Sequence, residues 1–220
     1  MSVTPLRLAV IIGSVREGRF GTVVAAWFAA QAATHGRFEI DVIDLAEADI
    51  PLVLPAVSPA LEPNPERPAG MLDLTERLSA ADAFVIVTPD YNHSYPASLK
   101  AVIDWHFTQW QRKPIAFVGY SGATGGLTAI EHLRQVFSEL DAHTVREYVS
   151  FPRYYLLFGE DGQLLAPAEP EAAAQTMLDR LQWWAEALVA ARALVAGDPA
   201  RAMPAASIDN SGRRPATSRA

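Results

Sequence analysis

Residues 13–21 combine the side chains that a phosphate-binding loop needs. Glycines are interspersed there with Ser14, Arg16 and Arg19. Glycine allows close backbone approach, a serine hydroxyl donates hydrogen bonds, and arginine pairs with phosphate oxygens. The segment precedes a predicted helix, whose N-terminal amides attract anions. Its spacing matches neither the dinucleotide-binding fingerprint nor the P-loop. It therefore indicates a phosphate site of another kind, or else an ordinary turn with two solvated arginines.

Two later segments are similar in character. Residues 88–100 begin Thr-Pro-Asp-Tyr-Asn and mix aromatic, amide and hydroxyl groups that suit the polar edge of a flat heterocycle. The Asp, Asn and Ser residues of this segment are also ordinary turn formers, so the two interpretations are balanced. Residues 119–126 hold four glycines, which indicate backbone close to a ligand, although a tight turn would explain two of them.

The apolar pattern predicts five strands that alternate with five helices. Short β-branched runs are typical of buried strands, and apolar residues three and four apart are typical of helices. Such alternation predicts an α/β fold with a doubly wound parallel sheet, whose ligands bind beyond the carboxyl ends of the strands. The three polar segments follow the first, third and fourth strands. We expect strands at 7–12, 38–44, 84–87, 115–118 and 144–149, and helices at 20–34, 70–81, 97–108, 126–140 and 170–196.

Two stretches lack this periodicity. Residues 51–70 contain six prolines, which lack an amide hydrogen, so they predict a long loop. Beyond Gly197 the sequence is polar and aperiodic. We therefore expect one domain over residues 1–196 and a flexible C-terminal tail over 197–220.

Composition excludes several classes of protein. The 220 residues carry a formal net charge of −7, which argues against a nucleic-acid partner, and they include no cysteine. No apolar run reaches the roughly 20 residues that span a bilayer, so we expect a cytoplasmic protein without a membrane partner. Neither Ser14 nor Ser121 lies in a G-x-S-x-G elbow. His106 and His132 fall in predicted helices, where we expect packed or surface imidazoles. No His, Asp and Glu set has the spacing of a metal site.

Taken together, the three segments resemble the NADPH-dependent FMN reductases of the flavodoxin-like superfamily, which include chromate, quinone and azo-dye reductases. The resemblance covers about residues 6–190, with the motifs in the family's order. The matching residues are Gly13-Ser14-Val15-Arg16 for the phosphate loop, Thr88-Pro89-Asp90-Tyr91-Asn92 with Leu99-Lys100 and Ile103-Asp104-Trp105 for the T-P-E-Y-N…L-K-x-x-I-D-W signature, and Ser121, Gly125-Gly126 and Leu133-Arg134 for the third loop and its helix.

This resemblance implies a flavodoxin-like five-stranded sheet of order 2-1-3-4-5 with helices on both faces, and a non-covalently bound FMN. Hydride would pass from NADPH or NADH to the flavin and on to a small-molecule acceptor, without a catalytic side chain. Relatives form homodimers, often dimers of dimers. The implied FMN-binding residues are Ser14, Arg16, Arg19 and Phe20 at the phosphate, Pro89, Asp90, Tyr91 and Asn92 at the ring edge, and Ser121 and Gly122 from the third loop.

The chain departs from the family pattern at several positions. Arg19 stands where many relatives carry a small hydroxyl residue, Gly21 where they carry Asn, and Asp90 where they carry Glu. Two alternatives are a flavodoxin-type FMN electron carrier and a flavin-free binding relative. Flavodoxins have few arginines in the phosphate loop, so Arg16 and Arg19 argue against the carrier.

Overall fold

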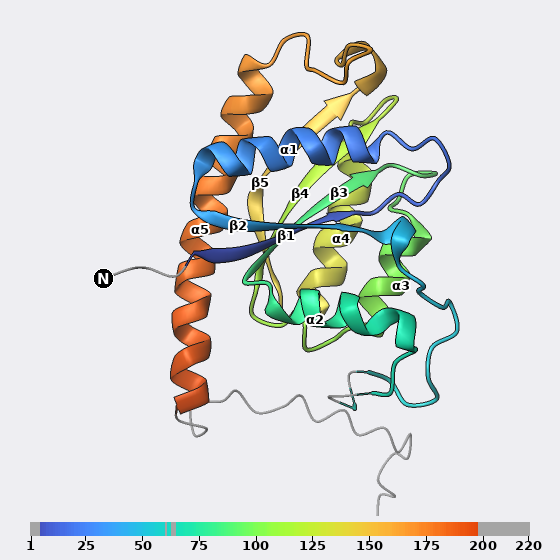
Figure 1. The fold of residues 1–220 in the computed structure, drawn as a ribbon, viewed down its shortest axis with the longest axis vertical. Helices are drawn as coiled ribbons and strands as arrows, with labels where there is room; N and C mark the ends of the chain where they lie inside the picture. Colours follow the sequence, from blue (N-terminus) through green and yellow to red (C-terminus); the bar gives the residue numbers. More distant parts are fainter. Residues whose placement is uncertain (1–4, 60, 63–64, 198–220) are drawn as a thin grey trace, which may run out of the picture.

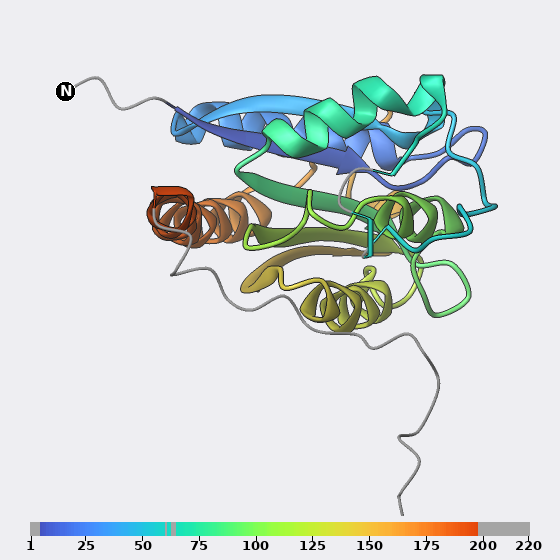
Figure 2. The same ribbon diagram turned by 90° about the horizontal axis from the view of Figure 1, so that it is seen from below.

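The computed structural model describes residues 5–59, 61–62 and 65–197, and it contains one sheet of five parallel strands. The strand order is β2-β1-β3-β4-β5, which confirms the predicted doubly wound topology. Figure 2 shows the strands one beneath another with a progressive twist. The strands are β1 (Leu6–Ile12), β2 (Phe38–Asp44), β3 (Ala83–Pro89), β4 (Pro114–Ser121) and β5 (His143–Pro152).

Five helices cover the two faces of the sheet (Figure 1), as the family resemblance implied. On one face lie α1 (Gly21–His35) and α5 (Ala168–Gly197), and on the other lie α2 (Leu72–Ala80), α3 (Ala97–Trp105) and α4 (Leu127–Glu139). Short 3-10 turns occupy Leu45–Glu47, Ala69–Met71 and Tyr154–Leu156. Within the described ranges, no helix is long and apolar enough to cross a membrane.

Burial explains why the central strands could be identified from sequence. Every residue of β3 is buried, because helices cover both faces of this strand. Successive side chains of a strand point to opposite faces. In β1, Val10 therefore packs with α1 and α5, while Ile11 packs with α2 and α3.

One predicted helix ends earlier than its periodicity indicated. We expected a helix over 97–108, but α3 ends at Trp105, and His106 has extended backbone angles (φ −127°, ψ 122°). Side-chain contacts hold this turn: the Trp105 indole donates to the Pro51 carbonyl (2.7 Å), and His106 bonds to the Val102 carbonyl (2.8 Å). At the C-terminus, α5 ends at Gly197; the tail prediction for the following residues lies outside the described part.

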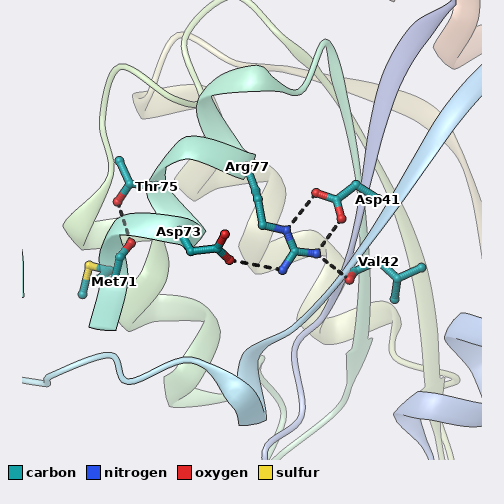
Figure 3. Close-up of polar contacts among 6 residues, drawn as sticks. All are labelled: Asp41, Val42, Met71, Asp73, Thr75 and Arg77. Carbon is teal, nitrogen blue, oxygen red and sulfur yellow. Dashed lines mark hydrogen bonds and ion pairs between the residues drawn. The ribbon is translucent and has the colours of Figure 1, made fainter. Parts of the chain in front are cut away.

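On each edge strand of the sheet, an arginine side chain from a neighbouring helix donates hydrogen bonds to backbone carbonyls. Figure 3 shows Arg77 of α2 reaching the Asp41 carboxylate and the Val42 carbonyl of edge strand β2. Arg134 of α4 donates in the same way to the Val145 and Arg146 carbonyls of β5, at 2.6 and 2.9 Å. Exposed strand edges favour pairing with other chains, so these two contacts protect the edges.

We expect Arg77→Ala to destabilise the protein by about 1 kcal/mol, because it removes a two-point ion pair and a bond to a strand carbonyl. The effect stays small because Asp41 is 43% exposed in its side chain. Urea unfolding measures the change. Arg37→Ala is the control: Arg37 is exposed and makes no ion pair within the described residues. Equal effects of the two substitutions would contradict this role of Arg77 at the edge strand.

Candidate cofactor site

The carboxyl ends of β1, β3 and β4 meet around a cavity of about 220 Å³. Eight of the ten residues predicted to bind the cofactor line it. A larger hollow of about 410 Å³ lies between α1 and residues 161–167, but it is lined by acidic side chains and no basic ones, which is unsuitable for a phosphate. The residues lining the smaller cavity are Ser14, Arg16, Phe20, Pro89, Asp90, Tyr91, Tyr120, Ser121, Gly122 and Tyr154.

A tight turn after β3 brings Tyr91 to the phosphate loop. Tyr91 and Ser94 exchange backbone hydrogen bonds of 2.7 and 3.1 Å, and Asn92 and His93 between them have positive φ angles of 51° and 64°. Two such residues form the hairpin turn that matches strand twist. The Tyr91 hydroxyl then lies 2.6 Å from Ser14 Oγ. Asn92 is not among the residues lining the cavity; its predicted contact with the ring stays a prediction.

Asp90 connects the turn after β3 to the third loop. Its Oδ2 accepts a hydrogen bond from Thr124, whose hydroxyl lies 3.1 Å from Ser121 Oγ. Its Oδ1 is buried and has no hydrogen-bond partner within the described chain. A buried carboxylate oxygen without a donor is costly, so this atom marks a place where a ligand group or water is expected.

Most of the glycines in the third loop are explained by packing rather than by a ligand. A Cβ on Gly126 would lie 2.6 Å from the Gly119 Cα, and a Cβ on Gly119 would lie 2.6 Å from the Gly125 carbonyl. Only Gly122 both lines the cavity and has open space around its Cα. The backbone of this loop therefore approaches the cavity at Gly122, while Gly119 and Gly126 allow the loop to fold against β4 and Gly125 allows it to pack against β5.

The two arginines of the first loop are placed differently. Arg16 is exposed, lines the cavity and forms no ion pair within the described ranges. Arg19 does not line the cavity; its guanidinium forms an ion pair with Asp44 at the end of β2. The predicted phosphate contact of Arg19 stays a prediction, and Arg16 is the arginine that faces the cavity.

Two tyrosines were missed by the sequence analysis. Tyr120, near the end of β4, and Tyr154, after β5, line the cavity and pack together with ring centroids 5.4 Å apart. Tyr154 also packs on Phe20 at 4.8 Å. Burial strongly raises the pKa of Tyr120, and a hydrogen bond from Ser14 offsets part of that rise. The Tyr120 phenol is therefore a neutral donor. The only sequence signal for Tyr120 was its position inside the glycine-rich segment 119–126.

The first turn of α1 fits the phosphate end of a flavin nucleotide. Phe20 precedes the helix and supplies no side-chain cap, and the turn contains no acidic residue. Its amides therefore offer an uncompensated partial positive charge next to Ser14 and Arg16. Sites for whole drug-sized ligands measure roughly 300–1,000 Å³. The cavity of about 220 Å³ is smaller than such sites, so it would hold only part of a flavin nucleotide.

Fold and site together define an α/β protein of flavodoxin-like topology with a cavity at its strand ends that Ser14 and Arg16 line. The family model for NADPH-dependent FMN reductases matches residues 6–155, and the chain belongs to this family. It is accordingly an NAD(P)H-dependent oxidoreductase with FMN as its cofactor.

Individual relatives agree with this assignment, and a solved structure agrees with the fold. An NAD(P)H-dependent FMN reductase of Schizosaccharomyces pombe is 32% identical over 135 residues, which are 57% of this chain and 62% of that protein. A probable NADPH:quinone oxidoreductase of Oryza sativa is 30% identical over 170 residues, 74% of this chain and 80% of that protein. The flavoenzyme FerB of Paracoccus denitrificans, an NAD(P)H:(acceptor) oxidoreductase, has a TM-score of 0.64 at 23% identity; the match covers 82% of this chain and 97% of FerB.

Proposed function

We propose that this chain reduces quinone-class acceptors with electrons from NAD(P)H. The overall reaction is NAD(P)H plus a proton plus quinone giving NAD(P)⁺ plus hydroquinone, so one hydride and one solvent proton are transferred. Bound FMN supplies the ring that takes up the hydride and hands the two electrons on. The names of the rice relative and of quinone reductases from Escherichia coli and Burkholderia support the acceptor class. The observation that carries the proposal is the cradle of Ser14, Arg16 and the uncapped α1 terminus.

The protein's own groups bind and orient rather than react. Arg16 and the first-turn amides of α1 neutralise the cofactor phosphate. Pro89, Asp90 and Tyr91 present the chain after β3 to the ring edge, and Gly122 approaches from the third loop. The ion pair between Arg19 and Asp44 holds the first loop against the end of β2.

Steady-state kinetics test this proposal. FMN-loaded protein should oxidise NADPH or NADH in the presence of benzoquinone. The kinetics should be ping-pong, because the nicotinamide and the quinone occupy the same site in turn. The same assay is run with free flavin, chromate, an azo dye and a nitro compound as alternative electron acceptors. Uptake of FMN without oxidation of either nicotinamide would contradict the proposal and favour a one-electron carrier.

A comparison of two variants separates the roles of the two arginines. We expect Arg16→Ala to weaken FMN binding by about tenfold or more, because it removes a cation at the phosphate cradle. Arg19→Ala should weaken it less, since Arg19 is paired with Asp44. Flavin fluorescence titration gives both dissociation constants. A larger loss in Arg19→Ala would show instead that Arg19 turns from Asp44 to the phosphate.

We further propose that the enzyme is a homodimer or a dimer of dimers and that it resides in the cytoplasm. The family resemblance supports the assembly, and light scattering of the FMN-loaded protein measures it. The cytoplasmic location stays an expectation from the sequence.

A further inference from the structure

Gly21, the first residue of α1, has no side chain where a longer one would collide with Tyr120. A Cβ built on Gly21 would lie 2.8 Å from the Tyr120 hydroxyl oxygen and 3.1 Å from Ile12 Cγ2. The φ angle of Gly21 is not in the left-handed region, so its conformation does not require glycine. Glycine in a helix costs up to about 1 kcal/mol relative to alanine. Space for the Tyr120 hydroxyl therefore accounts for this glycine.

The Tyr120 hydroxyl thus lies over the first turn of α1. Tyr120 is only 3% exposed, and its ring is held by Phe20 and Tyr154. Tyr120 lines the same cavity as Arg16. A residue of β4 therefore occupies the space next to the phosphate cradle that a side chain at position 21 would otherwise fill.

Three hydroxyl-bearing residues lie together at the cavity. The Tyr91 and Ser14 oxygens are 2.6 Å apart, and Ser14 lies near enough to the Tyr120 phenol to lower its pKa. The structure gives the Tyr120 proton no hydrogen-bond acceptor within the described residues, so this proton is available to a ligand in the cavity.

We propose that Tyr120 donates a hydrogen bond to the 5′-phosphate of FMN and that Gly21 keeps the space for this hydroxyl. This inference rests on the proposed function only in taking FMN as the ligand. It adds a residue from β4 to a phosphate cradle otherwise formed by the first loop. The contact selects for phosphorylated flavin, because riboflavin lacks the acceptor.

Binding of FMN and of riboflavin to the same variants tests the proposal. Tyr120→Phe keeps the ring and its packing and removes only the hydroxyl. A hydrogen bond to a charged group predicts a loss of FMN affinity of about ten- to hundredfold, with riboflavin affinity changed less than about twofold. Fluorescence titration measures both. Tyr148→Phe is the matched control, because this tyrosine is 41% exposed on β5 and does not line the cavity.

A second variant tests the link to Gly21. Gly21→Ala should displace the hydroxyl and weaken FMN binding several-fold. In the Tyr120→Phe background the nearest ring atom, Cζ, lies 3.7 Å from that Cβ, an ordinary contact. In the Tyr120→Phe background, Gly21→Ala should therefore cause a much smaller further loss of FMN affinity than it does in the wild-type chain. Such non-additive effects are typical of residues in contact.

Two results would overturn the proposal. One is unchanged FMN affinity in Tyr120→Phe, and the other is an equal loss for FMN and riboflavin, which would place the effect at the ring or in the fold. Thermal unfolding of each variant detects a folding defect. If the wild-type chain binds FMN but oxidises no NAD(P)H, the proposed function fails, and the affinity comparison still decides on Tyr120.

Discussion

Lowering the pH from about 6.5 to about 4 should remove roughly 3 kcal/mol of stability through one residue, His106. The pKa of His106 is lowered from 6.5 to about 4, chiefly by burial and to a smaller extent by the charge of Arg67, while the hydrogen bond to Val102 opposes the shift. The unfolded chain therefore binds more protons than the folded chain between these two pH values, so the free energy of unfolding falls as the pH falls. The magnitude follows from about 1.4 kcal/mol per pKa unit.

The neutral ring of His106 has a hydrogen-bond partner at each nitrogen. The Val102 carbonyl can only accept, so Nδ1 donates to it, and Nε2 then accepts from the Thr75 hydroxyl at 2.9 Å. Figure 3 shows that Thr75 also lies within hydrogen-bond distance of the Met71 carbonyl. A protonated ring would donate from Nε2 to the Thr75 oxygen, whose proton would then go to the Met71 carbonyl, so no hydrogen bond need be lost. The cost of protonation is the charge that it brings into a side chain that is fully buried.

Urea unfolding between pH 4 and 7 measures this effect in wild type and in His106→Asn. The variant keeps a donor near Nδ1 and removes the titrating group, so it should be less stable at pH 7 and lose less stability on acidification. His93→Asn removes an exposed imidazole and serves as the control. The same acid dependence in His106→Asn as in wild type would show that other groups cause it.

The central strands β1, β3 and β4 could be predicted from sequence because they are short apolar runs whose burial on both faces requires β-branched and aliphatic residues, and the edge strand β2 because polar and apolar residues alternate along it. The three loops could be predicted because a parallel sheet places the carboxyl ends of its strands together. The strand order came from the family resemblance, and the residues in the loops that follow β1, β3 and β4 define the cavity.

The remaining features depend on tertiary contacts that no local pattern contains. Tyr120 belongs to the site because β4 continues to Ser121, three residues beyond its apolar run. Tyr154 belongs to it because β5 extends to Pro152 and the chain then turns over Phe20. Arg19 pairs with Asp44, which is 25 residues away. The positions of these three residues depend on where the strands end in space, which the local sequence does not specify.

The glycine-rich third loop leads to the second large effect. Gly126→Ala should destabilise the protein by about 3–5 kcal/mol, because overpacking and an unfavourable backbone angle act together. The new Cβ would lie 2.6 Å from the Gly119 Cα and 2.7 Å from the Tyr120 nitrogen, and the φ angle is +86°. These are backbone atoms of β4, which cannot yield without shifting the strand.

Gly122→Ala is the matched comparison within the same loop. It has open space around its Cα and no left-handed φ angle, so its stability should change by less than about 0.5 kcal/mol. Since Gly122 lines the cavity, the added methyl group should instead weaken FMN binding. Urea unfolding and flavin titration of both variants therefore separate the two uses that we expect of glycine here: Gly126 allows the loop to fold against β4, and Gly122 leaves room for the cofactor. Equal unfolding free energies for the two variants would contradict this division, because the collision at Gly126 would then have been relieved without cost.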